Sequence, residues 1–303
     1  MNTPIRRVMI AIITFNGDYY IEKCINSIKS TKHEITIEIV DNASTDGTKD
    51  ILDKFKSKIN TRFLNENIGF GQANNILLKQ AIKENYDYIY LLNQDAYYIE
   101  NSLDNLIDYT YKYCDNCIVS PFHLKNTTGI IEKGFKYRLD QSKKDSIDSL
   151  VKTDFVNAAA WLMPIKLVKL VGGFSPLFFH YGEDNDYANR LKWFGFNFII
   201  CPTSFIVHDR EYKRIKDSLR NDDKTYKKKV QVHLLTQLSN INSCIFGVLI
   251  SSSITLLGVV KKTLVIGKVQ LALFLLFDYI AMIILVNQIM QHRLTARKKG
   301  AFL

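Results

Sequence analysis

The run VMIAIITF, residues 8–15, decides the class of fold that this sequence can adopt. None of its side chains is charged, and a strand that is apolar along its whole length is covered on both faces, as in the middle of a parallel sheet. Apolar residues at helical spacing follow between Ile21 and Ile28. The chain is therefore expected to begin with a buried strand and a helix that covers it.

The same alternation of strand and helix continues downstream. Three more strands are expected, at residues 35–40, 62–64 and 86–92. Strands that alternate with helices indicate an α/β fold with a parallel, doubly wound sheet. Residues 196–208 are read as a further strand. Residues 126–150 are polar and are expected to form a loop over the site, with one short strand near Phe135.

Polar side chains follow these strands at the points where they end. They are Thr14 and Asn16 after the first strand, Asp41 and Asn42 after the second, Asn67 after the third, and Asn93 and Asp95 after the fourth. Turn chemistry explains any one of these groups, but ligands of parallel sheets bind at the carboxyl ends of the strands, where all four groups meet. The motifs G-x-G-x-x-G and G-x-x-x-x-G-K-[ST] do not occur in the sequence. A nucleotide at this rim would therefore be held by carboxylates and amides.

The stretch HYGEDNDYANRL is read as a helix that starts at its Gly182. Its apolar stripe is formed by Tyr187, Ala188, Leu191 and Phe194. Asp184 is expected on that inward stripe, and Glu183 is expected to point elsewhere. Asp186 and Arg190 are four residues apart and are expected to pair on the flank. An acid in the first turn is either a cap that the helix dipole favours or a working group in a cleft.

Together these motifs resemble one enzyme family. The segments are VMIAIITFN, DNASTDGT, NENIGFGQANN, LLNQD, GGFSPLFFHYGEDNDYANRL and a later VH. In order and spacing they are similar to the family 2 glycosyltransferases of the GT-A fold, and among these to the rhamnosyl- and galactofuranosyl-type transferases of bacterial surface polysaccharides. The resemblance covers residues 8–208. It implies a GT-A type (Rossmann-like), mostly parallel sheet flanked by helices, and inverting transfer of a sugar from a UDP- or dTDP-sugar to a hydroxyl of a lipid-linked saccharide.

The resemblance also implies a role for individual residues. Asp184 matches the catalytic base, Asp41 the acid that binds the donor's base, Asp95 the last acid of the D-x-D element that holds a divalent metal, and His208 a histidine that completes the metal shell. Thr14, Asn16, Asn67 and Asn93 are placed with Asp41 and Asp95 around the nucleotide sugar, and Glu183 and Trp161 in the sugar and acceptor pocket. Trp161 lies in a small-residue-rich apolar stretch, so a core strand is the alternative interpretation of that residue.

The expected chemistry agrees with these roles. A divalent cation, Mn or Mg, on carboxylate and phosphate oxygens offsets the charge of a departing nucleoside diphosphate. A single base that activates the acceptor hydroxyl gives inversion, whereas a hydrolase needs two carboxylates that flank the bond. The sequence departs from the family at Asn93, which stands where D-x-D has its first aspartate and brings no charge to the metal.

The C-terminal part of the chain has a different composition. Residues 241–260 carry no charge, and residues 269–289 are interrupted only by Asp278. If both segments crossed a bilayer, the lysines between them would lie outside, against the positive-inside rule. A helical hairpin in the cytoplasmic leaflet of the inner membrane fits better. The alternative is a buried helical pair that completes the globule or forms a homodimer contact.

Charge and cysteine content bear on the location and partners of the protein. The net charge is +10, with basic residues concentrated at residues 213–229 and 293–299. No nucleic-acid-binding signature accompanies them, so we expect a membrane surface and no nucleic acid as partner. The five cysteines are scattered, which is typical of reduced thiols in the cytosol. The expected domains are a GT-A domain at residues 1–210, a basic linker or helix at 211–240, and a membrane-associated apolar hairpin at 241–303.

Two other classes of function remain open from the sequence. A sugar-1-phosphate nucleotidyltransferase would need a glycine- and arginine-rich loop after the first strand, where this chain has TFNGDYY. A non-catalytic membrane scaffold that binds nucleotide sugar would explain Asn93, but it would have no use for a base at Asp184.

Overall fold

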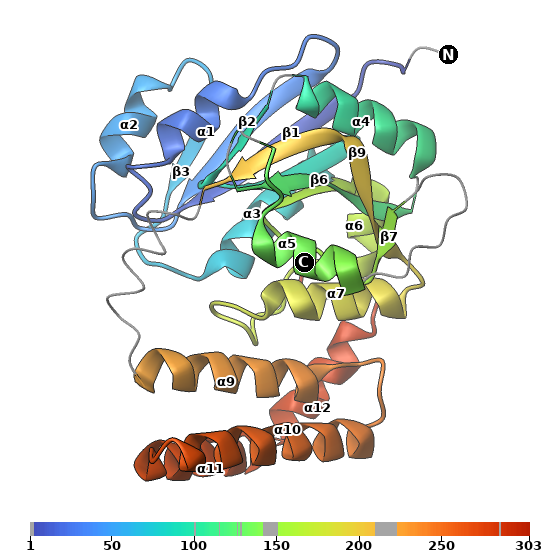
Figure 1. The fold of residues 1–303 in the computed structure, drawn as a ribbon. Coiled ribbons are helices and arrows are strands. Elements are labelled where there is room, and N and C mark those ends of the chain that lie inside the picture. The colour runs from blue at the N-terminus through green and yellow to red at the C-terminus, as the bar shows by residue number, and fades with distance from the viewer. Residues whose placement is uncertain are drawn as a thin grey trace.

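The computed structural model describes residues 3–99, 101–114, 116–125, 127, 129–141, 151–209, 223–284 and 286–303. In these parts of the chain nine strands form one mixed sheet (Figure 1). They are β1 (Arg7–Thr14), β2 (Glu34–Asp41), β3 (Asn60–Phe63), β4 (Tyr88–Asn93), β5 (Ala96–Tyr98), β6 (Cys117–Leu124), β7 (Val151–Thr153), β8 (Ala160–Pro164) and β9 (Asn197–His208). Their order is β3-β2-β1-β4-β8-β6-β9-β5, and β7 also pairs with β9.

The first four strands in this order are parallel, as the alternation of strand and helix predicts. β8 then enters antiparallel between β4 and β6, and β5 and β7 run antiparallel to β9. β1 is covered on both faces: Met9 and Ala11 belong to one core cluster, whereas Ile10 and Ile12 belong to another. The alternation of side chains along a strand explains this division.

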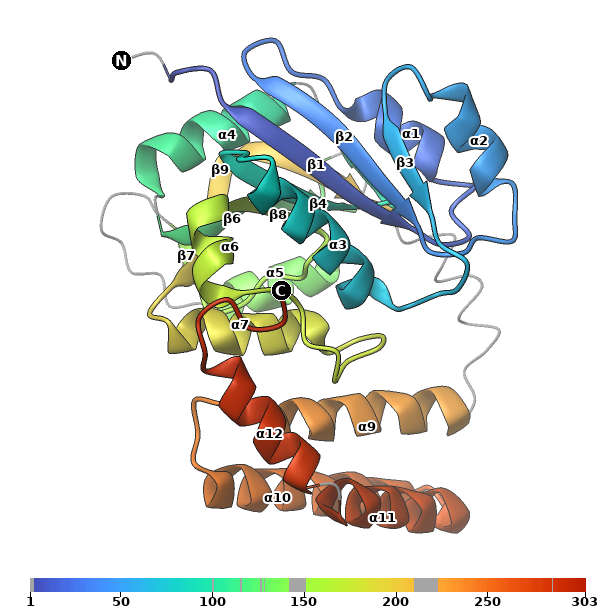
Figure 2. The ribbon, with the colours of Figure 1, turned by 180° about the vertical axis from the view of Figure 1, so that it is seen from behind.

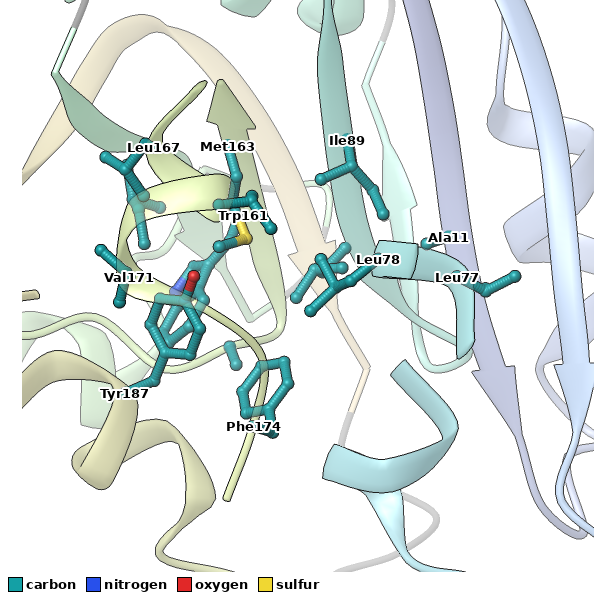
Figure 3. Packing of buried hydrophobic residues seen from close by; sticks show 14 of the residues in the cluster. Ala11, Leu77, Leu78, Ile89, Trp161, Met163, Leu167, Val171, Phe174 and Tyr187 are labelled. Carbon is teal, nitrogen blue, oxygen red and sulfur yellow. The ribbon is translucent and has the colours of Figure 1, made fainter. Parts of the chain in front are cut away.

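Helices pack on both faces of the sheet. α1 (Ile21–Ser27), α2 (Thr48–Lys54) and α4 (Ser102–Tyr113) contribute to the cluster of Ile10 and Ile12. α3 (Phe70–Lys83), α5 (Lys133–Gln141), α6 (Ile165–Val171) and α7 (Glu183–Trp193) contribute to the cluster of Met9 and Ala11, part of which is shown in Figure 3. The predicted α/β architecture is therefore confirmed.

The segment around Phe135 differs from its prediction. It forms helix α5, where a loop with a short strand was expected. Phe135 is buried against Phe122 and His123, and Leu139, one helical turn later, packs on the same core. This i, i+4 spacing is a helical signal that the polar composition of the segment hides. Residues 126, 128 and 142–150 of the expected loop lie outside the described residues.

The cysteines also differ from expectation at one pair. Cys114 and Cys117 are joined as a disulfide, while Cys24, Cys201 and Cys244 are free. The short connection between α4 and β6 brings the Cα atoms of the pair to 5.6 Å, a separation that suits a disulfide.

The C-terminal part is a layer of helices beside the sheet domain. It consists of α9 (Asp223–Ser239), α10 (Ile245–Val265), α11 (Val269–Ile284) and α12 (Val286–Ala296). α9 lies between the sheet domain and the pair α10 and α11 (Figure 1), and these helices share a core that includes Leu234, Leu256 and Leu275. Among the described residues α10 is long and apolar enough to cross a membrane, and α11 with α12 meets the same criterion only as a bent pair.

The chain does not end in this layer. α12 runs from it back toward α7, and the C-terminus lies beside the sheet domain (Figure 2). The last residue, Leu303, packs against the same core cluster as α3 and α6.

Candidate active site

Asp41 ends β2 at the carboxyl rim of the sheet, directly beside Thr14 of β1. Only 3% of the residue is exposed. The backbone N–H of Ser44 donates to Oδ1 of Asp41 at 2.9 Å. Its Oδ2 is buried and has no hydrogen-bond partner among the described residues. Because an unsatisfied buried carboxylate oxygen is costly, this atom suits a ligand that brings an N–H.

Asn67 and Asn42 organise the adjoining turn into α3. The side-chain amide of Asn42 donates to Oδ1 of Asn67 at 2.9 Å, and this oxygen also accepts from the N–H of Gly69. Oδ1 of Asn42 accepts from the N–H of Ile68. Both asparagines are therefore at the predicted rim, where they fix the path of the backbone next to Asp41.

Thr14 and Asn16 likewise hold the rim together. Thr14 is fully buried, and its hydroxyl donates to Oε1 of Gln94 at 2.5 Å. Asn16, which is exposed, accepts at Oδ1 from the N–H of Thr45 and so joins the β1 and β2 ends. The side chain of Thr14 thus holds Gln94 at the rim, and its contact with the donor stays a prediction.

Gln94 is a residue that the sequence analysis missed. Its Oε1 accepts from the N–H of Phe15 at 3.0 Å as well as from Thr14, and its Nε2 donates to the carbonyl of Phe15. A Cβ atom at Gly17 would lie 2.2 Å from Gln94 Oε1, so a larger residue there would displace the Gln94 side chain. Gln94 stands between Asn93 and Asp95 in the quoted LLNQD motif, so its position was a usable signal.

Asp95 and His208 are brought together, as predicted. β5 pairs with β9 so that Ala96 faces His208, and this register places Nε2 of His208 3.4 Å from Oδ1 of Asp95. The His208 side chain is 1% exposed and that of Asp95 is 12% exposed. A cavity of about 110 Å³ opens beside Asp95, lined by Tyr19, Tyr20, Lys23, Gln94, Asp95, Tyr97 and Asp209.

A carboxylate and an imidazole at one place are ligand types that a divalent ion such as Mn accepts. Among the residues that the structure describes, no group of three or more His, Cys, Asp or Glu side chains could hold a metal ion. Asp95 and His208 supply two ligand types, so a metal held by them would need its remaining ligands from other groups, such as a bound diphosphate and water. Asn93 is half-buried at the end of β4, and its N–H donates to the carbonyl of Ala159.

The first turn of α7 carries two acids whose exposure is the reverse of that predicted. Gly182 caps the helix with φ of 91°. Glu183 is buried, with Oε2 lacking a hydrogen-bond partner in the described part of the chain, whereas Asp184 is half-buried. Burial and the neighbouring charge of Asp184 raise the pKa of Glu183 to about 7. Oδ1 of Asp184 accepts from the N–H and the amide of Asn185.

The apolar stripe of Tyr187, Ala188 and Leu191 is buried as expected, but Asp184 is not part of it. The buried face of α7 runs through Glu183, Asp186, Tyr187 and Arg190, which are spaced as one helical stripe. Asp186 and Arg190 do pair, with Nε to Oδ2 at 2.9 Å, but they are buried and not on the flank. Asp186 has a further partner in His292 of α12, and Arg190 donates to the carbonyl groups of Val171 and Gly173 at the end of α6, none of which hydropathy along α7 reveals.

Trp161 lies in strand β8 and is fully buried. It packs against Phe174, Tyr187 and Phe198, as Figure 3 shows for the first two. The core-strand interpretation is therefore correct, and the expectation of a sugar-stacking Trp161 is wrong.

The N-terminus of α3 connects the rim with α7. A Cβ atom at Gly69 would lie 2.3 Å from the carbonyl oxygen of Phe179, in the loop before α7. A Cβ atom at Gly71 would lie 3.7 Å from Cβ of Glu183. The acids of α7 thus stand across the start of α3 from the asparagines that adjoin Asp41.

Known proteins share parts of this chain. dTDP-rhamnosyl transferase RfbG of Shigella flexneri is 32% identical over 139 residues, which are 44% of this chain and 46% of that protein. Abequosyltransferase RfbV of Salmonella typhimurium is 29% identical over 113 residues, 36% of this chain and 34% of that protein. The matches thus span less than half the length of these relatives.

Solved structures share the fold at low identity. Staphylococcus aureus TarS residues 1–349 with UDP superposes with a TM-score of 0.53 at 14% identity, covering 80% of this chain and 68% of that one. GalNAc-T7 with UDP, GalNAc and Mn2+ gives a TM-score of 0.58 at 15% identity, covering 69% of this chain and 44% of that one. The chain therefore has a GT-A fold.

The profile of the family described as Glycosyl transferase family 2 matches residues 9–164. That range runs from β1 to the end of β8 and includes Asp41, Asn67 and Asp95 of the rim. It covers half of the chain, and it agrees with the GT-A neighbours in fold. The chain belongs to glycosyl transferase family 2.

Proposed function

We propose that the protein is an inverting glycosyltransferase of bacterial surface polysaccharide synthesis. It would transfer a sugar from a UDP- or dTDP-sugar to a hydroxyl of a lipid-linked saccharide, and the similarity to RfbG favours a rhamnose-like sugar. The observation that carries the proposal is the buried rim of Asp41, with one carboxylate oxygen unpaired, set across the start of α3 from the acids Glu183 and Asp184.

Asp41 would bind the base of the donor. Uracil and thymine both present a ring N–H between two carbonyl groups, and Oδ2 of Asp41 is a buried acceptor for such a donor group. This contact does not discriminate between UDP and dTDP, because the two bases differ only in a methyl group away from that N–H. The solved neighbours with UDP support a uridine or thymidine nucleotide.

Asp95 and His208 would hold a divalent cation, Mn or Mg, at the diphosphate. Such an ion offsets the negative charge that develops on the leaving nucleotide. The GalNAc-T7 structure contains Mn2+, and an imidazole ligand suits Mn better than Mg. Asn93 keeps the polarity of this end of β4 without adding charge.

Asp184 would be the general base that takes the proton of the acceptor hydroxyl. It is more exposed than Glu183, and it lies on a helix whose N-terminus favours its charge. Glu183, buried behind it, would shape the sugar and acceptor pocket. One accessible base and no covalent partner correspond to inversion.

The protein would work on the cytoplasmic face of the inner membrane. The outer faces of α10 and α11 expose Phe246, Ile250, Ile254, Leu257, Leu273, Phe274, Phe277, Ile280 and Ile284. Their opposite faces pack on α9 in the shared core, which supports a pair that lies on the protein and dips into one leaflet. An apolar face of this size rimmed by Lys261, Lys262 and Lys268 suits an anionic leaflet.

The test is an assay of purified full-length protein with a panel of UDP- and dTDP-sugars and a lipid-linked saccharide acceptor. Release of nucleotide that requires the acceptor is the expected result. Binding of a donor without turnover on any acceptor would instead support the non-catalytic scaffold, and release of pyrophosphate from a nucleoside triphosphate and a sugar phosphate would support the nucleotidyltransferase.

A further inference from the structure

A buried polar network joins α7 to α12. Asp186 and Arg190 are 1% and 0% exposed, and His292 of α12 is 7% exposed. Nε2 of His292 lies 2.9 Å from Oδ1 of Asp186, while Nε of Arg190 donates to Oδ2 of the same carboxylate at 2.9 Å. Both carboxylate oxygens are therefore used, as a buried charge requires.

The same network reaches the turn that follows α6. Arg190 donates from Nη1 to the carbonyl of Val171 at 2.9 Å and from Nη2 to the carbonyl of Gly173 at 2.6 Å. Nδ1 of His292 lies 3.0 Å from the hydroxyl of Ser175. His292 thus contacts α7 through one ring nitrogen and the turn through the other.

The last residues of the chain lie on this turn as well. The N–H of Gly173 donates to the carbonyl of Ala301 at 2.8 Å, and that of Gly300 donates to the carbonyl of Leu170. The ring of Phe302 stacks on His292 with 5.4 Å between centroids. Gly172 has φ of 94°, and a Cβ atom there would lie 1.9 Å from the carbonyl oxygen of Ala301, so the two backbones are in direct contact. Figure 2 shows how α12 and the C-terminus return to this region.

The turn leads directly into the acids of the site. Residues 176–182 follow it and end at the start of α7. On the way Phe178 is buried, with its ring 6.3 Å from that of His292, and the carbonyl of Phe179 touches the start of α3. A displacement of the turn would therefore move Glu183 and Asp184 relative to the nucleotide rim.

We propose that His292 is a positioning residue for sugar transfer. Together with residues 300–303 it fixes the segment 172–182 and the first turn of α7. The C-terminal segment of the chain therefore holds in place the part of the site that would bind the acceptor. The role in transfer rests on the proposed function. The two ring nitrogens of His292 bond to Ser175 and Asp186, on the side of the acids of α7, so donor binding at the rim should depend on His292 much less.

The test compares full-length wild type with His292→Ala and His292→Gln. His233, which is exposed on α9, gives the matched control His233→Gln. A misplacement of about 1 Å costs up to about 100-fold in rate, so we expect His292→Ala to lower kcat at least about tenfold and to leave donor KM within about twofold. His292→Gln can still reach Asp186 and should recover most of kcat. His233→Gln should behave as wild type.

Hydrogen–deuterium exchange supplies a readout that needs no substrate. In His292→Ala the amides of residues 172–191 should exchange faster, while those of β1, β2 and β4 should not change. If that variant does not fold, Ser175→Ala removes one of the two contacts and should show the same pattern more weakly. Unchanged exchange at residues 172–191, or a uniform loss of protection with loss of donor binding, would overturn the proposal. If wild type shows no transferase activity but His292→Ala still shows the selective change in exchange, the proposed function is rejected and the coupling of α12 to α7 is retained.

Discussion

Replacement of Glu183 by glutamine should change how stability depends on pH. Burial and the charge of Asp184 raise the pKa of Glu183 from 4.5 to about 7 in the folded protein. Between these values the folded state keeps a proton that the unfolded state releases, so the free energy of unfolding falls as pH rises. A shift of this size corresponds to a loss of about 3 kcal/mol, which is complete above pH 7. Glutamine stays neutral and keeps the shape, so the variant should not show this loss.

The measurement is the free energy of unfolding from urea titrations at pH 5, 6, 7 and 8, on wild type and Glu183→Gln. The difference between the two proteins should grow in favour of the variant by about 2.5 kcal/mol over this range, because part of the loss has already occurred at pH 5. Glu66→Gln, at an exposed position, controls for the removal of one negative charge. A difference that stays constant with pH would show that Glu183 is not held protonated by its surroundings, and the reasoning from burial would be refuted.

Three further predictions concern the reaction and the location. Asp184→Asn should lower turnover by about 10²–10⁴ with donor affinity nearly unchanged, as measured by steady-state kinetics and donor titration, and retention of more than about a tenth of the rate would exclude Asp184 as the base. Asp95→Ala should weaken both metal binding and donor binding, whereas Asn93→Asp should leave the metal affinity equal to that of wild type or raise it. Full wild-type activity in excess chelator would remove the metal from the mechanism. The double variant Phe274→Asp, Phe277→Asp changes two exposed positions of α11 and should lower binding of the protein to the membrane fraction and to anionic vesicles. The control variant Tyr137→Asp, on α5, should bind as wild type does. Equal sedimentation of both variants with membranes would contradict the proposed membrane contact of α11.

Much of the fold could be predicted because its strongest signals are local. The apolar run of β1 requires cover on both faces, and the polar residues after each strand must share one rim once the strands are parallel. Asp95 and His208 could be paired only through the family, since 113 positions separate them and the register of β5 with β9 brings them together.

The remaining errors have a common physical cause. Hydropathy indicates which side chains prefer burial, but a charged side chain is buried when a partner from elsewhere in the chain compensates it. Arg190 is fully buried because Asp186, two carbonyl groups and the end of the chain surround it. Trp161 gave the opposite error, since its place in a motif-rich region suggested a pocket, while its neighbours Phe174 and Tyr187 enclose it.

The return of α12 bears on how the two parts of the protein can be separated experimentally. The donor-site motifs all precede residue 210, which suggests that a chain ending near residue 240 would still bind donor. Such a chain would also lose His292 and residues 300–303, and Asp186 would keep Arg190 as partner but lose the hydrogen bond at its other oxygen. A buried charged group that loses a hydrogen bond costs about 1.5–3 kcal/mol, and the cost would fall on the helix that carries Asp184. Loss of transfer in the shortened chain therefore could not be assigned to loss of the membrane face. Substitutions confined to the outer face of α11 leave the contacts of α12 in place, so they isolate the contribution of the membrane.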